Sequence, residues 1–102
     1  ISSPNKLVTF KKIIKAVAEF YDIKEKDLLS KSRKKEIVYP RQIAMYLLRE
    51  ELKSSFPYIA RKFGGKDHTT AIYAYEKISK EREKRENLNE EINLIKERIY
   101  SE

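Results

Sequence analysis

Apolar residues recur every three to four positions through most of the chain, which predicts a succession of amphipathic helices. The first helix follows Thr9, a favourable N-cap, and extends to about Tyr21 with its apolar side chains along one face. Its lysines at positions 11, 12 and 15 lie on the other faces. A basic amphipathic helix can lie on an acidic membrane surface, but this spacing is more typical of a helix packed in a core.

Three more helical patterns follow before the first glycine. Residues 25–29 predict a single turn that places two leucines in the core. A proline suits the first turn of a long helix over residues 40–52, because its missing N–H is not needed there. Ser54 or Ser55 can then cap a short helix that has Pro57 in its first turn.

Two glycines, Gly64 and Gly65, interrupt the helical pattern. Glycine readily adopts positive-φ conformations, so this pair can end one helix and turn the chain into the next. Asp67, or Lys66 before it, begins the new helix, since Asp is a favoured N-cap and its charge suits the positive end of the helix dipole. The first turn is polar and contains His68, Thr69 and Thr70. This layout is typical of a helix-turn-helix, whose second helix offers its N-terminal end to DNA bases.

The C-terminal part predicts an exposed helical continuation and then a final helix. Residues 80–86 are almost all charged with alternating sign, which suits a solvated helix. Asn87 and Glu90 have the spacing of a capping box and predict a restart over residues 87–100. An aliphatic stripe follows at Leu88, Ile92, Ile95 and Ile99. It is too short for a coiled coil, so this helix is expected to pack back on the domain or on a partner.

Composition supports a single all-α domain, a small helical bundle that contains the helix-turn-helix. A chain of 102 residues with 40% hydrophobic content can bury a real but modest core. Only two glycines and three prolines, with 38% charged residues, favour helix. The absence of cysteine excludes disulfides and thiolate chemistry and fits a cytoplasmic protein, and no apolar run is long enough to span a bilayer.

The charge distribution favours a polyanionic partner. The formal net charge is +7, yet residues 81–102 hold five Lys or Arg against seven Asp or Glu. The basic excess therefore belongs to the first 80 residues, which contain the predicted turn. The densest basic run, residues 31–35, is either a solvated loop or an arm that follows phosphates or enters a minor groove, where arginine is favoured.

Catalysis is not expected, and neither is a cofactor or a metal. Asp67 and His68 could form an acid–base pair, but no nucleophile or metal-binding cluster accompanies them in the sequence. Each also has a purely structural interpretation, since His68 can be a surface histidine and Asp67 only a helix cap. A binding surface therefore ranks above an enzyme.

Several motifs resemble one protein family. The sequence Gly-Gly-Lys-Asp-His-Thr-Thr-Ala at residues 64–71 resembles the signature of the DnaA family of bacterial replication initiators, Gly-Gly-Arg-Asp-His-Thr-Thr-Val. Asp-Leu-Leu-Ser-Lys at residues 27–31, the loop with Arg33, and Pro-Arg-Gln-Ile-Ala-Met-Tyr-Leu at residues 40–47 are similar to the same family in the same order. The resemblance covers nearly the whole chain from Leu7 onward.

The resemblance implies the C-terminal DNA-binding domain of that family, a helix-turn-helix bundle of the Trp-repressor type over residues 7–102. Residues 1–6 are then a linker remnant, residues 7–21 a connecting amphipathic helix and residues 87–100 the C-terminal helix. No Gly-rich phosphate loop ending in Lys-Ser or Lys-Thr occurs in the sequence, which is consistent with a domain distinct from the family's ATPase.

By this resemblance, the domain binds double-stranded DNA at a short origin sequence, the DnaA box, in the initiation of bacterial chromosome replication. Asp67, His68 and Thr69 match the family's major-groove readers, and Arg33 matches its minor-groove arginine. These residue types suit the role, because Asp can accept from the cytosine amino group, and Thr and His can contact a thymine methyl. The predicted contacts to the DNA backbone are Lys31, Lys34, Arg41, Gln42, Arg49, Lys66, Thr70 and Lys77.

Two positions depart from the family pattern without removing the expected DNA binding. Lys66 replaces an arginine that could give one phosphate two hydrogen bonds, and Ala71 replaces a valine beneath the helix. The resemblance also implies other partners, namely acidic phospholipids at residues 7–21 and regulators of replication. The isolated domain is expected to be monomeric, because the family oligomerises through other parts.

Overall fold

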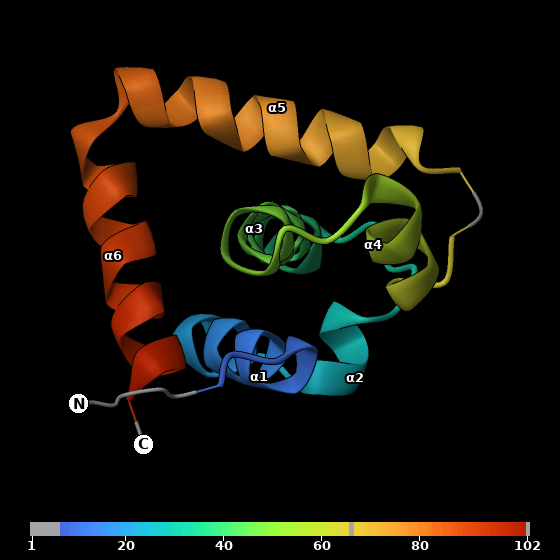
Figure 1. The fold of residues 1–102 in the computed structure, drawn as a ribbon, viewed down its shortest axis with the longest axis horizontal. Helices are drawn as coiled ribbons and strands as arrows, with labels where there is room; N and C mark the ends of the chain where they lie inside the picture. The colour runs from blue at the N-terminus through green and yellow to red at the C-terminus, as the bar shows by residue number, and fades with distance from the viewer. Residues whose placement is uncertain (1–6, 66, 102) are drawn as a thin grey trace.

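One long helix lies at the centre of the structure and the other helices pack around it (Figure 1). The computed structural model describes residues 7–65 and 67–101, so the predicted linker remnant and Lys66 lie outside the described residues. The helices are α1 (Phe10–Tyr21), α2 (Glu25–Leu28), α3 (Lys35–Leu52), α4 (Phe56–Lys62), α5 (Thr69–Lys84) and α6 (Glu86–Tyr100). This arrangement confirms an all-α bundle, with α4 and α5 meeting at the predicted corner.

The central helix is α3, which Figure 1 shows nearly end-on. It packs against α1, α2, α4 and α5, while α6 contacts α5 at one end and α1 at the other. The largest fully buried side chains are Ile13, Ile14, Leu28, Ile43, Leu47, Leu48, Ile59, Ile78, Leu88, Ile92, Ile95 and Ile99. Burial of each such side chain contributes about 1.5–3 kcal/mol. The aliphatic stripe of α6 thus packs back on the domain, as one of its two interpretations predicted.

Two of the predicted helix starts are confirmed in atomic detail. The Thr9 hydroxyl accepts a hydrogen bond of 3.2 Å from the backbone N–H of Lys12 and caps α1. The Ser55 hydroxyl accepts one of 3.2 Å from the N–H of Tyr58 and caps α4. Each bond satisfies one of the backbone donors that a helix start leaves without a partner.

The predicted start of the central helix is wrong. α3 begins at Lys35, so Pro40 lies inside the helix rather than in its first turn. The N–H groups of Ile37 and Val38 bond to the Lys34 carbonyl at 2.9 and 2.8 Å and close the first turn. Ile37 and Pro40 are buried, and their packing offsets the hydrogen bond that proline cannot donate. The basic loop is therefore shorter than predicted, because Lys35 belongs to the helix.

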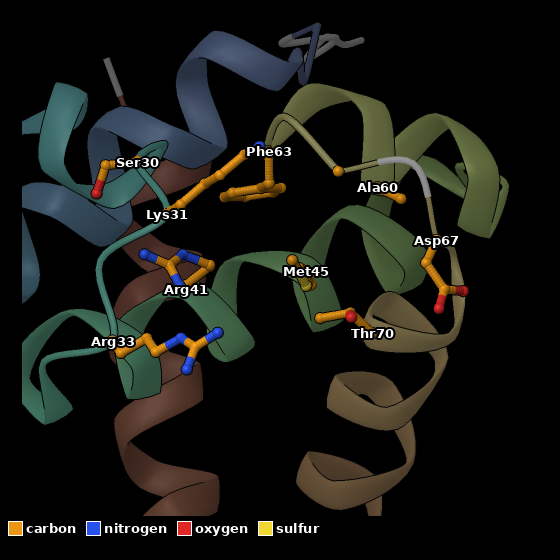
Figure 2. A pocket seen from close by; sticks show the side chains of 10 residues that line it. Ser30, Lys31, Arg33, Arg41, Met45, Ala60, Phe63, Asp67 and Thr70 are labelled. Carbon is orange, nitrogen blue, oxygen red and sulfur yellow. The ribbon is translucent and has the colours of Figure 1, made fainter.

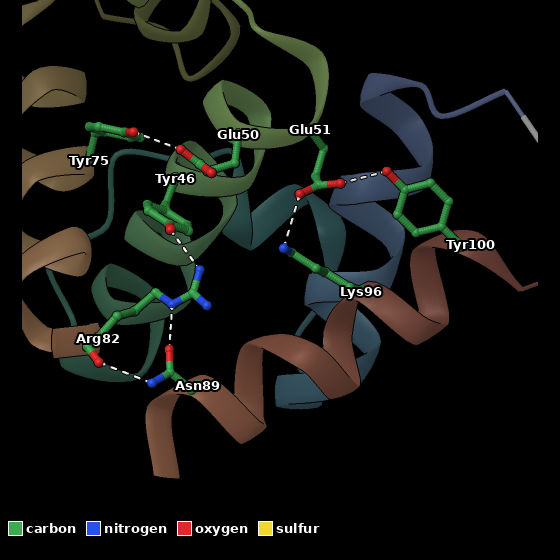
Figure 3. Close-up of polar contacts among 8 residues, drawn as sticks. All are labelled: Tyr46, Glu50, Glu51, Tyr75, Arg82, Asn89, Lys96 and Tyr100. Atoms are coloured by element: carbon green, nitrogen blue, oxygen red, sulfur yellow. Dashed lines mark hydrogen bonds and ion pairs between the residues drawn. The ribbon is translucent and has the colours of Figure 1, made fainter. Parts of the chain in front are cut away.

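The capping box predicted at Asn87 is also wrong. α5 ends at Lys84, Arg85 is extended, and α6 already begins at Glu86, which places Asn87 within its first turn. Hydrogen bonds of side chains, rather than a cap, fix the corner between α5 and α6 (Figure 3). Arg82 Nε donates to Asn89 Oδ1 at 2.6 Å, Asn89 Nδ2 donates to the Arg82 carbonyl at 3.0 Å, and Arg82 Nη1 donates to the Tyr46 hydroxyl at 2.8 Å.

Tyrosine–carboxylate hydrogen bonds join α3 to its neighbours (Figure 3). Tyr75 on α5 donates to Glu50 at 2.6 Å, and Tyr100 on α6 donates to Glu51 at 2.5 Å. The bond to Glu51 is the main cause that raises the pKa of Tyr100 to about 12, from 10.0. Because the folded pKa is raised, this bond stabilises the fold fully below pH 10.0 and is lost as the pH rises through about 12.

We expect Asn89→Ala to lower the free energy of unfolding by about 1–3 kcal/mol, because it removes two hydrogen bonds and leaves the partly buried Arg82 groups without partners. Urea denaturation measures the change. Asn93→Ala, at an exposed position of the same helix, serves as control and should change stability by less than about 0.5 kcal/mol. Equal effects of the two substitutions would contradict a role for Asn89 in the corner.

A second stability test concerns the C-terminal end of α3, where Lys53 adopts a left-handed conformation with φ 56° and ψ 31°. Glycine pays no steric penalty there, so Lys53→Gly should raise the free energy of unfolding by about 1 kcal/mol. Lys53→Ala removes the same charge but keeps the β-carbon, and it should give no gain. A gain of the same size for alanine, measured by urea denaturation, would show that the backbone conformation is not the cause.

Candidate nucleic-acid interface

The turn between α4 and α5 depends on one glycine in a left-handed conformation. Gly64 has φ +78°, whereas Gly65 does not require a positive φ. The N–H of Gly65 bonds to the Ala60 carbonyl at 2.9 Å and that of Gly64 to the Arg61 carbonyl at 3.0 Å, which satisfies the end of α4. The Phe63 side chain before them is buried in the core. This anchor directs the chain away from α4 towards the start of α5.

The Asp67 side chain caps the first N–H of α5 by a hydrogen bond, although the residue at the N-cap position is His68 and the helix begins at Thr69, later than predicted. Asp67 Oδ1 accepts a hydrogen bond of 3.0 Å from the Thr69 N–H. This backbone bond is the main cause that holds the pKa of Asp67 below its usual 3.8. Asp67, His68, Thr69 and Thr70 are all exposed, so the first turn of α5 faces solvent. One carboxylate oxygen serves the cap, and Oδ2 has no part in that bond.

Hydrogen bonds of two serines hold the basic loop before α3, a role that was not predicted for them. The Ser30 hydroxyl donates to the Asp27 carbonyl at 2.6 Å and accepts from the Ser32 N–H at 3.2 Å. The Ser32 hydroxyl accepts from the Lys34 N–H at 3.2 Å. Ser-x-Ser spacing before a helix is the signal that could have predicted this. The bracing fixes the loop while the Arg33 side chain remains exposed.

A cavity of about 290 Å³ brings the basic loop and the start of α5 together (Figure 2). Its lining residues are Ser30, Lys31, Arg33, Arg41, Met45, Ala60, Phe63, Gly65, Asp67 and Thr70. Figure 2 shows Arg33 and Lys31 on the loop side and Asp67 and Thr70 on the α5 side. Met45 and Phe63 also line the cavity, although neither was among the predicted site residues, and both side chains are buried.

Two arginines predicted to contact the DNA backbone also hold the fold together. Arg41 Nε donates to the Leu28 carbonyl at 3.3 Å, and burial lowers the pKa of this guanidinium. Arg49 Nη1 donates to the Ser54 carbonyl at 2.9 Å, and its guanidinium lies 4.4 Å above the centre of the Phe56 ring. A guanidinium has five N–H donors, so each arginine keeps donors beyond these contacts.

Gln42 and Lys77 meet each other across α3 and α5, away from the cavity lining. Lys77 Nζ donates to Gln42 Oε1 at 3.2 Å and forms an ion pair of 3.1 Å with Glu81 Oε2. Lys34 is exposed at the end of the basic loop. The structure therefore gathers part of the predicted contacts around one cavity and places Gln42, Arg49 and Lys77 elsewhere on α3 and α5.

A metal-binding cluster and a membrane span are both absent from the described part of the chain. No group of three or more His, Cys, Asp or Glu side chains within residues 7–65 and 67–101 is placed to hold a metal ion. Within those same residues, every helix is too short or too polar to cross a membrane.

Comparison with known proteins identifies the family. The profile described as "Bacterial dnaA protein helix-turn-helix" matches residues 10–78, which is more than half of the chain. The chain belongs to the bacterial DnaA helix-turn-helix family. The matched residues include α4, the glycine turn and the first part of α5.

Individual DnaA proteins are similar over most of this chain. The chromosomal replication initiator protein DnaA of Limosilactobacillus reuteri (strain DSM 20016) is 51% identical over 89 residues, which cover 87% of this chain and 20% of that protein. The protein of the same name from Leptothrix cholodnii is 43% identical over 99 residues, which cover 97% of this chain and 19% of that protein. The protein of the same name from Caldanaerobacter subterraneus subsp. tengcongensis is 48% identical over 99 residues, which cover 97% of this chain and 22% of that protein.

A solved structure is also similar over most of this chain. The chain titled "Crystal structure of DNA replication initiation factor" superposes with a TM-score of 0.79 at 33% identity, over 89% of this chain and 28% of that chain. The present chain spans about a fifth of the length of the DnaA relatives it matches, and it corresponds to their C-terminal part.

We expect the carboxyl group of Asp67 to titrate below pH 3.8, because the Thr69 N–H stabilises its charged form. Since the folded pKa is lowered, the cap is fully present above the ordinary pKa of Asp and is lost as the pH falls through the folded value. Carbon-13 NMR titration of the side chain measures the midpoint. A midpoint no lower than that in a peptide of residues 64–71 would contradict the cap.

Proposed function

We propose that this domain binds double-stranded DNA with sequence specificity at a DnaA box, in the cytoplasm, during the initiation of bacterial chromosome replication. The first turn of α5 enters the major groove, and the loop of residues 31–34 enters the adjacent minor groove. Membership of the DnaA helix-turn-helix family supports DNA binding in replication initiation. The observation that carries the two-groove proposal is the cavity that Arg33 and the start of α5 line together.

The major groove and the adjacent minor groove of DNA are separated by a sugar-phosphate backbone. A protein that reaches into both must present cations between its two reading elements. Lys31 and Arg41 line the same cavity as Arg33 and Thr70, and Figure 2 shows both cations on the side of Arg33. In the proposed complex, this cavity faces the backbone, and Lys31, Arg41 and Thr70 contact its phosphates.

The base-reading roles fall to Asp67, His68 and Thr69 in the major groove. Asp67 Oδ1 is engaged by the cap, so Oδ2 is the oxygen that accepts from a cytosine amino group. The ring of His68 and the methyl of Thr69 contact thymine methyl groups. Arg33 reads the width of the minor groove through its negative potential. Lys34, Gln42, Arg49, Lys66 and Lys77 contact the backbone, as the resemblance implies.

Acidic phospholipids are a second candidate partner, and the structure favours them less. The apolar side chains of α1, such as Ile13 and Val17, are fully buried in the core. To insert this face into a membrane, α1 would have to leave the bundle. Only the exposed lysines at positions 11, 12 and 15 are available for a superficial contact with headgroups. We therefore place DNA first, with the isolated domain as a monomer.

Two substitutions test the DNA-binding roles, one expected to weaken binding to the DnaA-box duplex alone and the other to weaken binding to both duplexes. Thr69→Ala should weaken binding to a DnaA-box duplex by about 1–3 kcal/mol and leave binding to a scrambled duplex almost unchanged, because it removes a base contact. The backbone N–H that Asp67 caps is retained in this variant. Lys34→Ala should weaken both complexes equally and reduce the salt slope by about one unit, as expected for a lost phosphate contact.

Fluorescence anisotropy at about 150 mM salt, where nonspecific affinity is weak, measures the affinities of the wild type and both variants for the two duplexes. Equal losses on the two duplexes for Thr69→Ala would exclude base reading by this residue. A wild-type domain that binds both duplexes equally would contradict sequence specificity altogether.

A further inference from the structure

The ammonium group of Lys77 is already neutralised by a carboxylate of its own helix. Lys77 Nζ lies 3.1 Å from Glu81 Oε2, one helical turn further along α5. The exposed fractions of the two side chains are 30% and 28%, so both are half-buried. The second oxygen, Glu81 Oε1, lies 3.5 Å from Arg85 Nη1. Glu81 therefore sits between two cations.

Groups on α3 hold Lys77 in this position. Its Nζ donates to Gln42 Oε1 at 3.2 Å and lies 5.7 Å from the centre of the Tyr39 ring. An ammonium has three N–H donors, of which Glu81 and Gln42 engage two. The pair is thus better fixed than an ordinary exposed ion pair between residues four apart on a helix.

This pairing distinguishes Lys77 from the other basic residues proposed to contact DNA. Arg41 and Arg49 bond to carbonyl oxygens, which leaves their positive charges uncompensated. Among the residues that the structure describes, Lys77 is the one proposed DNA-contacting cation whose charge an ion pair neutralises. A phosphate that approaches Lys77 meets the Glu81 carboxylate at the same place.

We propose that Glu81 is an internal competitor for DNA phosphate, which lowers the affinity of the domain for all duplexes by occupying Lys77. This inference rests on the proposed function. A phosphate must displace the carboxylate from Lys77 or bind beside it, and both outcomes carry a cost from like-charge repulsion. Because phosphates are the same in every sequence, the competition lowers cognate and random binding by the same factor.

The test compares Glu81→Gln with Glu83→Gln, which removes the same charge from an exposed position of the same helix. We expect Glu81→Gln to tighten binding to DnaA-box and scrambled duplexes about two- to fivefold more than Glu83→Gln does. It should also steepen the salt dependence by up to about one unit, since Lys77 then contacts the phosphate without a competing carboxylate. In a Lys77→Gln background, the additional effect of Glu81→Gln should disappear.

Three outcomes would overturn the proposal: equal effects of the two glutamine variants, weaker binding by Glu81→Gln, or an additional effect that persists without Lys77. The last outcome would assign the effect to Arg85. If Glu81→Gln does not fold, Glu81→Asp keeps the charge, withdraws it from Lys77 and should still tighten binding. Failure of the wild-type domain to bind either duplex would instead contradict the proposed function, so the two failures are distinguishable.

Discussion

Burial of α3 constrains the positions of the other helices. Ile43, Leu47 and Leu48 are completely buried, and α1, α2, α4 and α5 all pack against this one helix. Hydrophobic burial has little directional preference, so polar contacts must set the orientations. Glu50 and Glu51 are consecutive on α3 and therefore point about 100° apart, one towards Tyr75 on α5 and the other towards Tyr100 on α6 (Figure 3). Two adjacent carboxylates thus orient two different helices.

The same helix sets the distance between the two proposed DNA-reading elements. Arg41 bonds to the Leu28 carbonyl and so ties the end of α2, from which the basic loop departs, to the body of α3. Arg49 bonds to the Ser54 carbonyl and orders the connection towards α4. These arginines combine positioning with charge, because a planar guanidinium can donate to a carbonyl through one N–H and keep its other N–H groups for a phosphate.

Much of the fold could be predicted from the sequence because hydrophobic periodicity and capping chemistry are local. The starts of α1 and α4 follow from a threonine and a serine, and the α6 stripe is buried as one interpretation required. The start of α3 could not be predicted, because the cost of Pro40 inside a helix is offset by tertiary burial. The corner after α5 depends on Arg82, Asn89 and Tyr46, which lie far apart in the sequence.

The local pattern predicted a helix-turn-helix and a basic loop, and the family motif added the roles of the individual residues in the candidate site. Nothing in the local pattern decided whether the basic loop was solvated or faced the start of α5, since that depends on how α3 and α5 pack. The spacing of Lys77 and Glu81 permits an ion pair, but the contacts of Lys77 with Gln42 and Tyr39 come from another helix. Sequence thus indicated which residues bear the chemistry, and packing decided which of them meet.

The contact of α6 with α1 joins the two ends of the chain beside α3. Because α5 contacts α6 and α6 contacts α1, the first and last helices support each other although they lie at opposite ends of the chain. Removing either one would take away a helix against which the other packs. Neither helix can fray independently at low cost, so the domain should lose its terminal helices together with its core in one cooperative transition.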